Sequence, residues 1–104
     1  MSLEPETTMQ RTLRSAQDFA DAADLLKALG HPLRLRVVTL LARGREHVGA
    51  LAERLGIPPA IASQQLRILR MSGLVAATRE NGQAVYRLVD PRVVRLIRCM
   101  DSSR

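Results

Sequence analysis

Two side chains able to recognise bases, Gln64 and Arg67, lie in one stripe of a predicted helix. With Ala60 and Ser63 they are spaced i, i+3, i+4 and i+7, so they share a face of an α-helix. A glutamine amide can form paired hydrogen bonds with an adenine edge, and an arginine guanidinium can do so with guanine. The stripe therefore predicts contacts in the major groove of DNA. The alternative is an amphipathic helix whose outer face is merely solvated.

The elements around this stripe predict a helix-turn-helix. The helix that carries it runs from Pro59 to about Ser72 and is stopped by Gly73. A shorter helix, residues 48–55, precedes it, and residues 56–58 form the turn. The apolar positions expected to bury the two helices are Val48, Leu51, Ala52 and Leu55 in the first and Ala62, Leu66 and Leu69 in the second.

A β-hairpin follows the second helix. Residues 74–80 and 83–89 flank Asn81-Gly82, a pair that accepts positive φ at both central turn positions. A two-stranded ribbon is only marginally stable alone, so we expect the side with Tyr86 and Leu88 to pack on the helices. The tip would then project into solvent as a basic wing. A structural hairpin that touches nothing is the alternative. The tip residues are Arg79, Asn81 and Gln83.

Three more helices complete the expected fold. The first spans residues 16–29 and the second, central one residues 32–43, and Asp90-Pro91 starts a helix near the C-terminus. We therefore predict a mainly α fold with a small β-hairpin, a winged helix-turn-helix of five helices plus wing. Residues 16–104 form this DNA-binding and dimerisation domain, and residues 1–15 form a flexible tail.

Composition and charge agree with these elements. The chain is 46% hydrophobic but only 2% aromatic, and it has one cysteine. It shows no membrane span, no secretory signal and no catalytic set of residues, so we expect a cytoplasmic protein that is not an enzyme. The net charge is +6, and residues 54–87 hold five arginines against Glu80 alone. Such concentrated charge is typical of a polyanion binder, although a solvated basic surface is the alternative.

In its motifs the chain resembles the ArsR/SmtB family of winged helix-turn-helix repressors. The similarity covers about residues 23–100, and its most specific parts are LKALGHPLRLRVVTLL, the helix of residues 49–55, SQQLRILRMSGLV, and VYRL in the second wing strand. Ser63, Gln64 and Gln65 occupy positions where the family commonly has Ser-Gln-His, so one of the three departs. Pro58 and Ala60 stand where Ser or Thr is frequent.

The resemblance implies a homodimer that sits on a double-stranded DNA operator, an imperfect inverted repeat, until a chemical signal loosens it. We expect Arg70, Arg79 and Arg87 to contact phosphates. The full set of expected DNA contacts is Ser63, Gln64, Gln65, Arg67, Arg70, Arg79, Asn81, Gln83 and Arg87.

The first and last helices are expected to hold the dimer. The interface residues would be Phe19, Ala20 and Ala23 in the first helix and Val93, Leu96, Ile97 and Met100 in the last. Aspartates at 18, 21 and 24 and arginines at 92, 95 and 98 are each spaced by three. These ladders either face each other around the subunit interface or are independently solvated.

The signal is not evident from the sequence. Metal sensors of the family often carry a Cys-x-Cys pair at positions that here are His47 and Gly49, so we expect no metal and no cofactor. Redox-sensing relatives pair two cysteines, but here Thr39 stands where the first of the two would be. Cys99 is therefore either a possible effector or redox residue or a buried interface residue. A protein-interaction module and a constitutive regulator without an effector remain alternatives.

Overall fold

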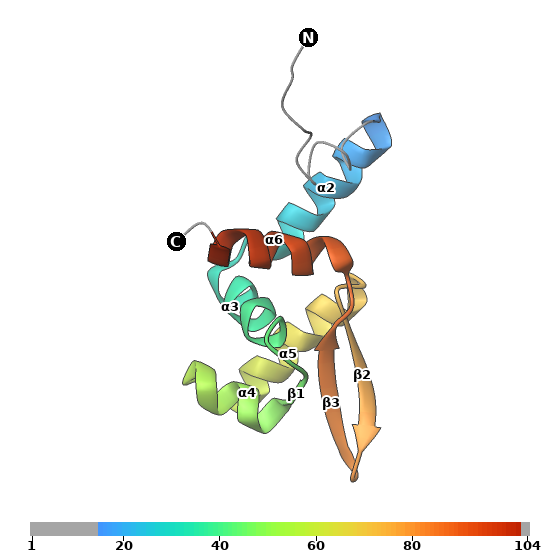
Figure 1. The fold of residues 1–104 in the computed structure, drawn as a ribbon. Coiled ribbons are helices and arrows are strands. Elements are labelled where there is room, and N and C mark those ends of the chain that lie inside the picture. The colour runs from blue at the N-terminus through green and yellow to red at the C-terminus, as the bar shows by residue number, and fades with distance from the viewer. Residues whose placement is uncertain (1–14, 103–104) are drawn as a thin grey trace.

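The computed structural model describes residues 15–102, and the predicted flexible tail lies outside them except for Ser15. Five helices and a small sheet follow in the order expected for a winged helix-turn-helix (Figure 1). The elements are α2 (Ala16–Leu29), α3 (Pro32–Leu41), β1 (Glu46–His47), α4 (Val48–Leu55), α5 (Pro59–Met71), β2 (Val75–Glu80), β3 (Gln83–Leu88) and α6 (Pro91–Ser102). The predicted fold class is confirmed, although α3 ends two residues earlier than expected.

Side-chain caps start α2, α3 and α4. Ser15 and Asp18 form a reciprocal capping box at the start of α2. The backbone N–H of Leu33 donates to Nδ1 of His31 at 3.2 Å, and that of Ala50 donates to Nδ1 of His47 at 3.3 Å. Both histidines are therefore helix caps.

The core forms where α3, α4 and α5 meet. Ala62, Leu66 and Leu69 on the inner face of α5 are fully buried, each 0% exposed. Leu66 and Leu69 belong to one core cluster with Val37 and Leu51, to which all the described helices contribute. The helix-turn-helix is therefore an integral part of the domain core.

The wing belongs to a three-stranded antiparallel sheet with the order β1-β3-β2. Asn81 and Gly82 have φ of 53° and 79°, which confirms the predicted turn. Tyr86 and Leu88 pack against the core as expected. The sequence did not predict β1, whose Glu46 and His47 pair with β3. This short strand ties the base of the wing to the start of α4.

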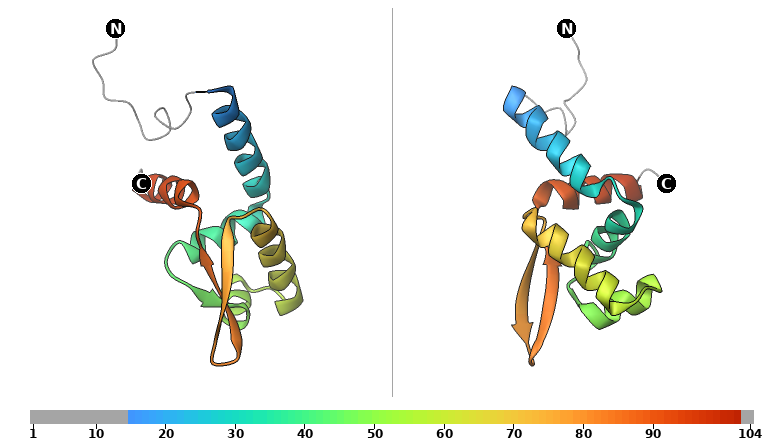
Figure 2. Two further views of the ribbon diagram at one scale, coloured as in Figure 1. Left: turned by 90° about the vertical axis from the view of Figure 1, so that its right-hand side faces the viewer. Right: turned by 180° about the vertical axis from the view of Figure 1, so that it is seen from behind.

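The two ends of the molecule differ in composition. In all three views the wing tip lies at the end opposite α2 (Figures 1 and 2). Phe19, Leu26 and Met100 are exposed at 59%, 53% and 48% at the α2–α6 end. None of the helices in residues 15–102 is long and apolar enough to cross a bilayer.

Two predicted interface residues need correction. Val93 and Ile97 of α6 are 0% and 3% exposed within one protomer, where they belong to the core. A side chain already covered by its own subunit offers almost no surface to a partner. The buried face of the amphipathic helix α6 is thus an intramolecular contact, and Leu96 and Met100 lie nearer the surface.

Asp90 joins the wing to α6. Its carboxylate accepts from the backbone N–H of Arg92 at 2.8 Å and pairs with the Arg92 guanidinium at 2.8 Å. The side-chain hydrogen bond from Arg92 lowers the pKa of Asp90, against the opposing effect of its burial. Asp90 thus caps α6 in its charged form.

We expect Asp90→Asn to lower the free energy of unfolding at neutral pH by about 0.5–1 kcal/mol, because asparagine still caps the helix but loses the ion pair. The folded pKa lies below the ordinary value of about 3.9, so this contribution is present above that value and disappears as the pH falls through the folded pKa. Urea unfolding of both proteins between pH 7 and pH 2 measures it. A stability difference that stays constant over this range would contradict the assignment, and Glu53→Gln serves as an exposed control.

Candidate nucleic-acid interface

The outer face of α5 carries the predicted base contacts. Ser63, Gln64 and Arg67 are all exposed, as is Arg70 at the edge of the same face. They are exposed because Ala62, Leu66 and Leu69 bury the opposite face completely. The structure therefore brings together on one surface the residues that the sequence assigned to base contact.

Gln65 does not share this face. Its side chain is half buried, and its Oε1 atom is buried without a hydrogen-bond partner. Helical geometry explains the difference, because Gln65 is one residue past the stripe and turns about 100° toward the protein body. The structure thus separates Gln65 from the predicted contact residues Ser63 and Gln64.

The turn before α5 fixes the angle between the two helices of the motif. Gly56 ends α4 in the left-handed conformation, with φ of 67°, which glycine adopts at little cost. The Arg36 guanidinium of α3 donates to the Leu55 carbonyl at 3.3 Å. A positive group at a helix C-terminus also interacts favourably with the helix dipole. Arg36 therefore helps to position α4, a role that sequence reasoning missed.

The start of α5 has no side-chain cap. Pro58 occupies the N-cap position and Pro59 the first helical position, and no side chain there bonds the helix backbone. Pro58 has no hydroxyl, so the N-terminus of α5 has no side chain there to cap the helix.

The predicted phosphate contacts of the wing lie on different faces of the ribbon. Arg79 is opposite Ala84 in the β2–β3 register, whereas Arg87 is opposite Ala76. Paired residues share a face, and neighbours alternate, so Arg79 lies on the face of Tyr86 and Arg87 on the other. The Arg79 guanidinium donates to the Gly82 carbonyl at 2.9 Å. Arg79 therefore lies against the wing tip, together with exposed Asn81 and Gln83.

An additional arginine, Arg45, lies beside the wing. Its guanidinium is 3.2 Å from the Glu80 carboxylate, and the two side chains are 65% and 37% exposed. Surface pairs of this kind contribute little to stability, but this one holds the Arg45 guanidinium next to Glu80 of the wing. No local pattern pointed to Arg45, because the strand β1 that holds it near β3 was not predicted.

Metal coordination finds no support in the described residues. Within residues 15–102 no group of three or more His, Cys, Asp or Glu side chains is placed to hold a metal ion. Nδ1 of both histidines accepts a backbone hydrogen bond. Cys99, the possible effector residue, is exposed on α6.

A helix-turn-helix whose second helix exposes a polar face, followed by a projecting hairpin, defines a winged helix-turn-helix DNA-binding protein. Residues 31–77 match the family described as "Bacterial regulatory protein, arsR family". The chain is 40% identical over 80 residues to the biofilm growth-associated repressor of Xylella fastidiosa. The aligned residues cover 77% of this chain and 70% of that protein.

Solved structures agree with this assignment. The transcriptional repressor BigR from Xylella fastidiosa superposes with a TM-score of 0.76 at 35% identity, over 86% of this chain and 95% of that one. A homodimeric winged helix-turn-helix DNA-binding domain from Mycobacterium bovis gives 0.72 at 33% identity, over 88% and 87%. The chain belongs to the ArsR family. It is a DNA-binding transcriptional regulator, not an enzyme.

We predict that Glu80→Gln strengthens binding to any duplex by about two- to fivefold, because it removes a negative charge beside the wing and releases Arg45 from its ion pair. Fluorescence anisotropy with specific and random duplexes measures the change. Glu53→Gln removes the same charge from α4 and is the matched control. Weaker binding by Glu80→Gln would show that the Arg45–Glu80 pair instead holds the wing in its binding position.

Proposed function

We propose that this chain acts as a homodimeric repressor that binds an operator with an imperfect inverted repeat and leaves it when a chemical signal binds. The observation that carries the proposal is the exposed Ser63, Gln64 and Arg67 face of α5 beside the wing. Two-fold symmetry implies half-site centres about 34 Å apart, one turn of DNA, or a multiple of it. Because the operator would be chromosomal, the proposal also implies a cytoplasmic location.

The apolar surface at the α2–α6 end supports the dimer. Phe19 and Leu26 of α2 and Met100 of α6 are large exposed apolar side chains, and Ala20 and Ala23 are exposed on α2. Clustered apolar surface of this kind is characteristic of a protein contact. The related Mycobacterium bovis domain is homodimeric. We therefore assign the interface to Phe19, Ala20, Ala23, Leu26, Leu96 and Met100.

The residue chemistry divides the DNA contacts into two classes. Gln64 and Arg67 are assigned to base edges, where a paired hydrogen bond contributes about 1–3 kcal/mol of discrimination. Arg70, Arg79 and Arg87 are assigned to phosphates, which supply affinity without sequence information. Ser63, Asn81 and Gln83 are placed to contact the backbone or the groove edge.

Two other functions are distinguished by simple observations. A winged helix that binds only proteins would form no salt-sensitive complex with duplex DNA. A constitutive regulator would bind its operator but respond to no effector. The exposed polar stripe with adjacent basic wing residues favours DNA binding over the first alternative. The charged cleft described in the next subsection favours an effector over the second.

The proposed function is tested by footprinting the DNA upstream of the gene itself, with and without metals, sulfide and oxidants. We expect two protected half-sites related by an inverted repeat. Complete absence of protection, together with no binding to random duplex in about 0.1 M salt, where electrostatic contacts still operate, would exclude a DNA-binding role.

The two classes of contact predict different mutant behaviour. Gln64→Ala should reduce discrimination between operator and random duplex by about 1–3 kcal/mol. Arg79→Ala should weaken binding to both duplexes alike and reduce the slope of log K against log salt by about one. Anisotropy titrations at several salt concentrations measure both. Equal losses on both duplexes for both variants would contradict the division.

The dimer interface has its own test. Leu26→Glu places a charge in the exposed apolar surface of α2 and should weaken dimerisation by about tenfold or more, as expected for a disrupted apolar contact. Analytical ultracentrifugation measures the dimer constant. Val89→Glu, which changes an exposed apolar residue directly after strand β3, is the matched control. If both variants remain dimeric, the α2 surface is not the interface.

A further inference from the structure

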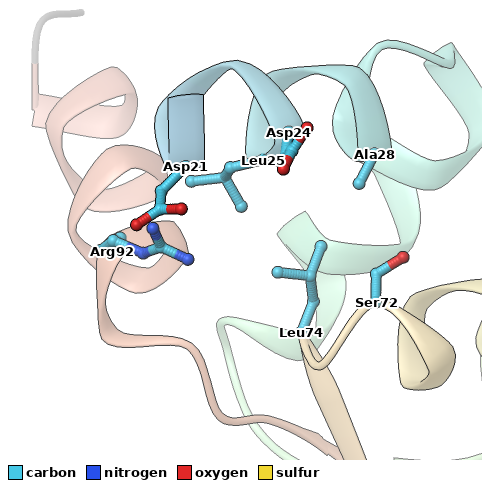
Figure 3. A pocket seen from close by; sticks show the side chains of 7 residues that line it. All are labelled: Asp21, Asp24, Leu25, Ala28, Ser72, Leu74 and Arg92. Atoms are coloured by element: carbon cyan, nitrogen blue, oxygen red, sulfur yellow. The ribbon is translucent and has the colours of Figure 1, made fainter. Parts of the chain in front are cut away.

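A cleft lies between the predicted dimerisation helices and the DNA-binding elements. Its volume is about 410 Å³, within the range of small-molecule sites. Figure 3 shows its walls, which come from α2, from the start of α6 and from the junction of α5 with β2. The lining residues are Asp21, Asp24, Leu25, Ala28, Ser72, Leu74 and Arg92.

The lining combines two carboxylates with an apolar floor. Leu25 and Leu74 are almost completely buried, at 6% and 3% exposed, whereas Asp21 and Asp24 are exposed. The two leucines therefore offer a ligand little surface, and the groups open to a ligand are mainly polar.

The charge of the cleft is opposite to that of the protein. The net charge of the chain is +6, yet Arg92 is the single cation in the lining. That guanidinium is already held by Asp90 at 2.8 Å. Asp21 points toward Arg92 (Figure 3) and contributes to raising the pKa of Arg92, after the larger effect of Asp90. The carboxylate of Asp24 is left to face a ligand cation.

Ser72 supplies a further acceptor. Its hydroxyl donates to the Ile68 carbonyl at 3.0 Å, so its oxygen lone pairs remain able to accept a hydrogen bond from a ligand N–H. The Asp24 carboxylate and the Ser72 oxygen are both acceptors suited to an ammonium or guanidinium N–H.

The cleft adjoins the proposed dimer interface, because Ala20 and Leu96 are four residues from the lining residues Asp24 and Arg92. At about 100° per residue, Asp21, Asp24 and Ala28 lie about half a turn around α2 from Phe19, Ala23 and Leu26. Leu25 lies between the two surfaces and is buried. A partner subunit seated on Phe19, Ala23 and Leu26 would therefore leave the Asp21 and Ala28 face of α2 uncovered.

The position of Leu74 connects the cleft to DNA binding. Its backbone N–H donates to the Leu69 carbonyl of α5, and its carbonyl accepts from Val89 after β3, both at 3.0 Å. A ligand in the cleft therefore lies beside the backbone junction between α5 and the wing. The spacing of these two elements must match the DNA grooves.

We propose that this cleft binds a small organic cation, an amine or guanidinium compound, and that this ligand changes the affinity of the protein for DNA. The proposal rests on the proposed function, because it assigns the effector site of the regulator. A ligand changes DNA affinity only to the extent that it binds the free and DNA-bound conformations differently.

The first experiment measures binding without DNA. The full chain is titrated with 2-phenylethylamine, butylamine and phenylguanidine, and with 2-phenylethanol and 3-phenylpropionate as neutral and anionic controls, by NMR of the backbone amides. We expect saturable shifts at residues 24, 28, 72 and 74 with the cations, and none with the anion. Asp24→Asn should weaken binding by about fivefold, as expected for loss of an exposed charge pair, and Glu53→Gln should leave it unchanged.

The second experiment repeats the operator titration with saturating cation. We expect the affinity for DNA to change for the unmodified chain and to change much less for Asp24→Asn, whose own operator binding without ligand stays intact. No binding by any of the three cations overturns the proposal, while operator binding alone would still support the proposed function. Equal effects on both proteins would show that the cation acts on the DNA, and would equally overturn it.

Discussion

The orientation of the DNA-binding helix depends on the complete burial of one face of α5. Ala62, Leu66 and Leu69 are each 0% exposed, and burying a leucine stabilises the fold by about 1.5–3 kcal/mol. A rotation of α5 by one residue would expose these side chains, so the orientation of the helix is fixed. The polar stripe of Ser63, Gln64 and Arg67 is thereby held toward solvent. A rigid, pre-oriented polar face is what recognition of a base sequence needs.

Two hydrogen-bonded joints transmit this orientation to the rest of the molecule. At one end of the motif, Arg36 of α3 holds the Leu55 carbonyl at the end of α4. At the other, the backbone of Leu74 bonds both to α5 and to the residue after β3. Asp90 then caps α6 directly after the wing. A displacement at the α2–α6 end therefore has a continuous bonded route to the DNA-binding elements.

The sequence predicted those elements whose signals are local. Gly56 and Gly73 delimit the two helices of the motif, and Asn81-Gly82 sets the hairpin turn, because these positions require positive φ. The two-residue strand β1 was missed, since its existence depends on pairing with β3, about forty residues away. Helical periodicity likewise identified an apolar face of α6 but not its partner: Val93 and Ile97 pack within the protomer.

In the candidate site, too, the features with local sequence signals were predictable and those that depend on tertiary contacts were not. The exposed face of α5 was predictable from spacing alone, whereas Arg45 and the cleft beside Leu74 depend on tertiary contacts that no local pattern encodes. Gln65 shows the limit even within a helix, because one position turns its amide from solvent toward the protein body.

The most direct test of the account is an NMR titration of the full chain with its operator duplex in about 0.1 M salt. If α5 and the wing contact DNA, the largest amide shifts fall on residues 63, 64 and 67 of α5 and on residues 79–83 of the wing. The absence of any complex, or shifts concentrated on α2 and α6 with the α5 face unchanged, would contradict it.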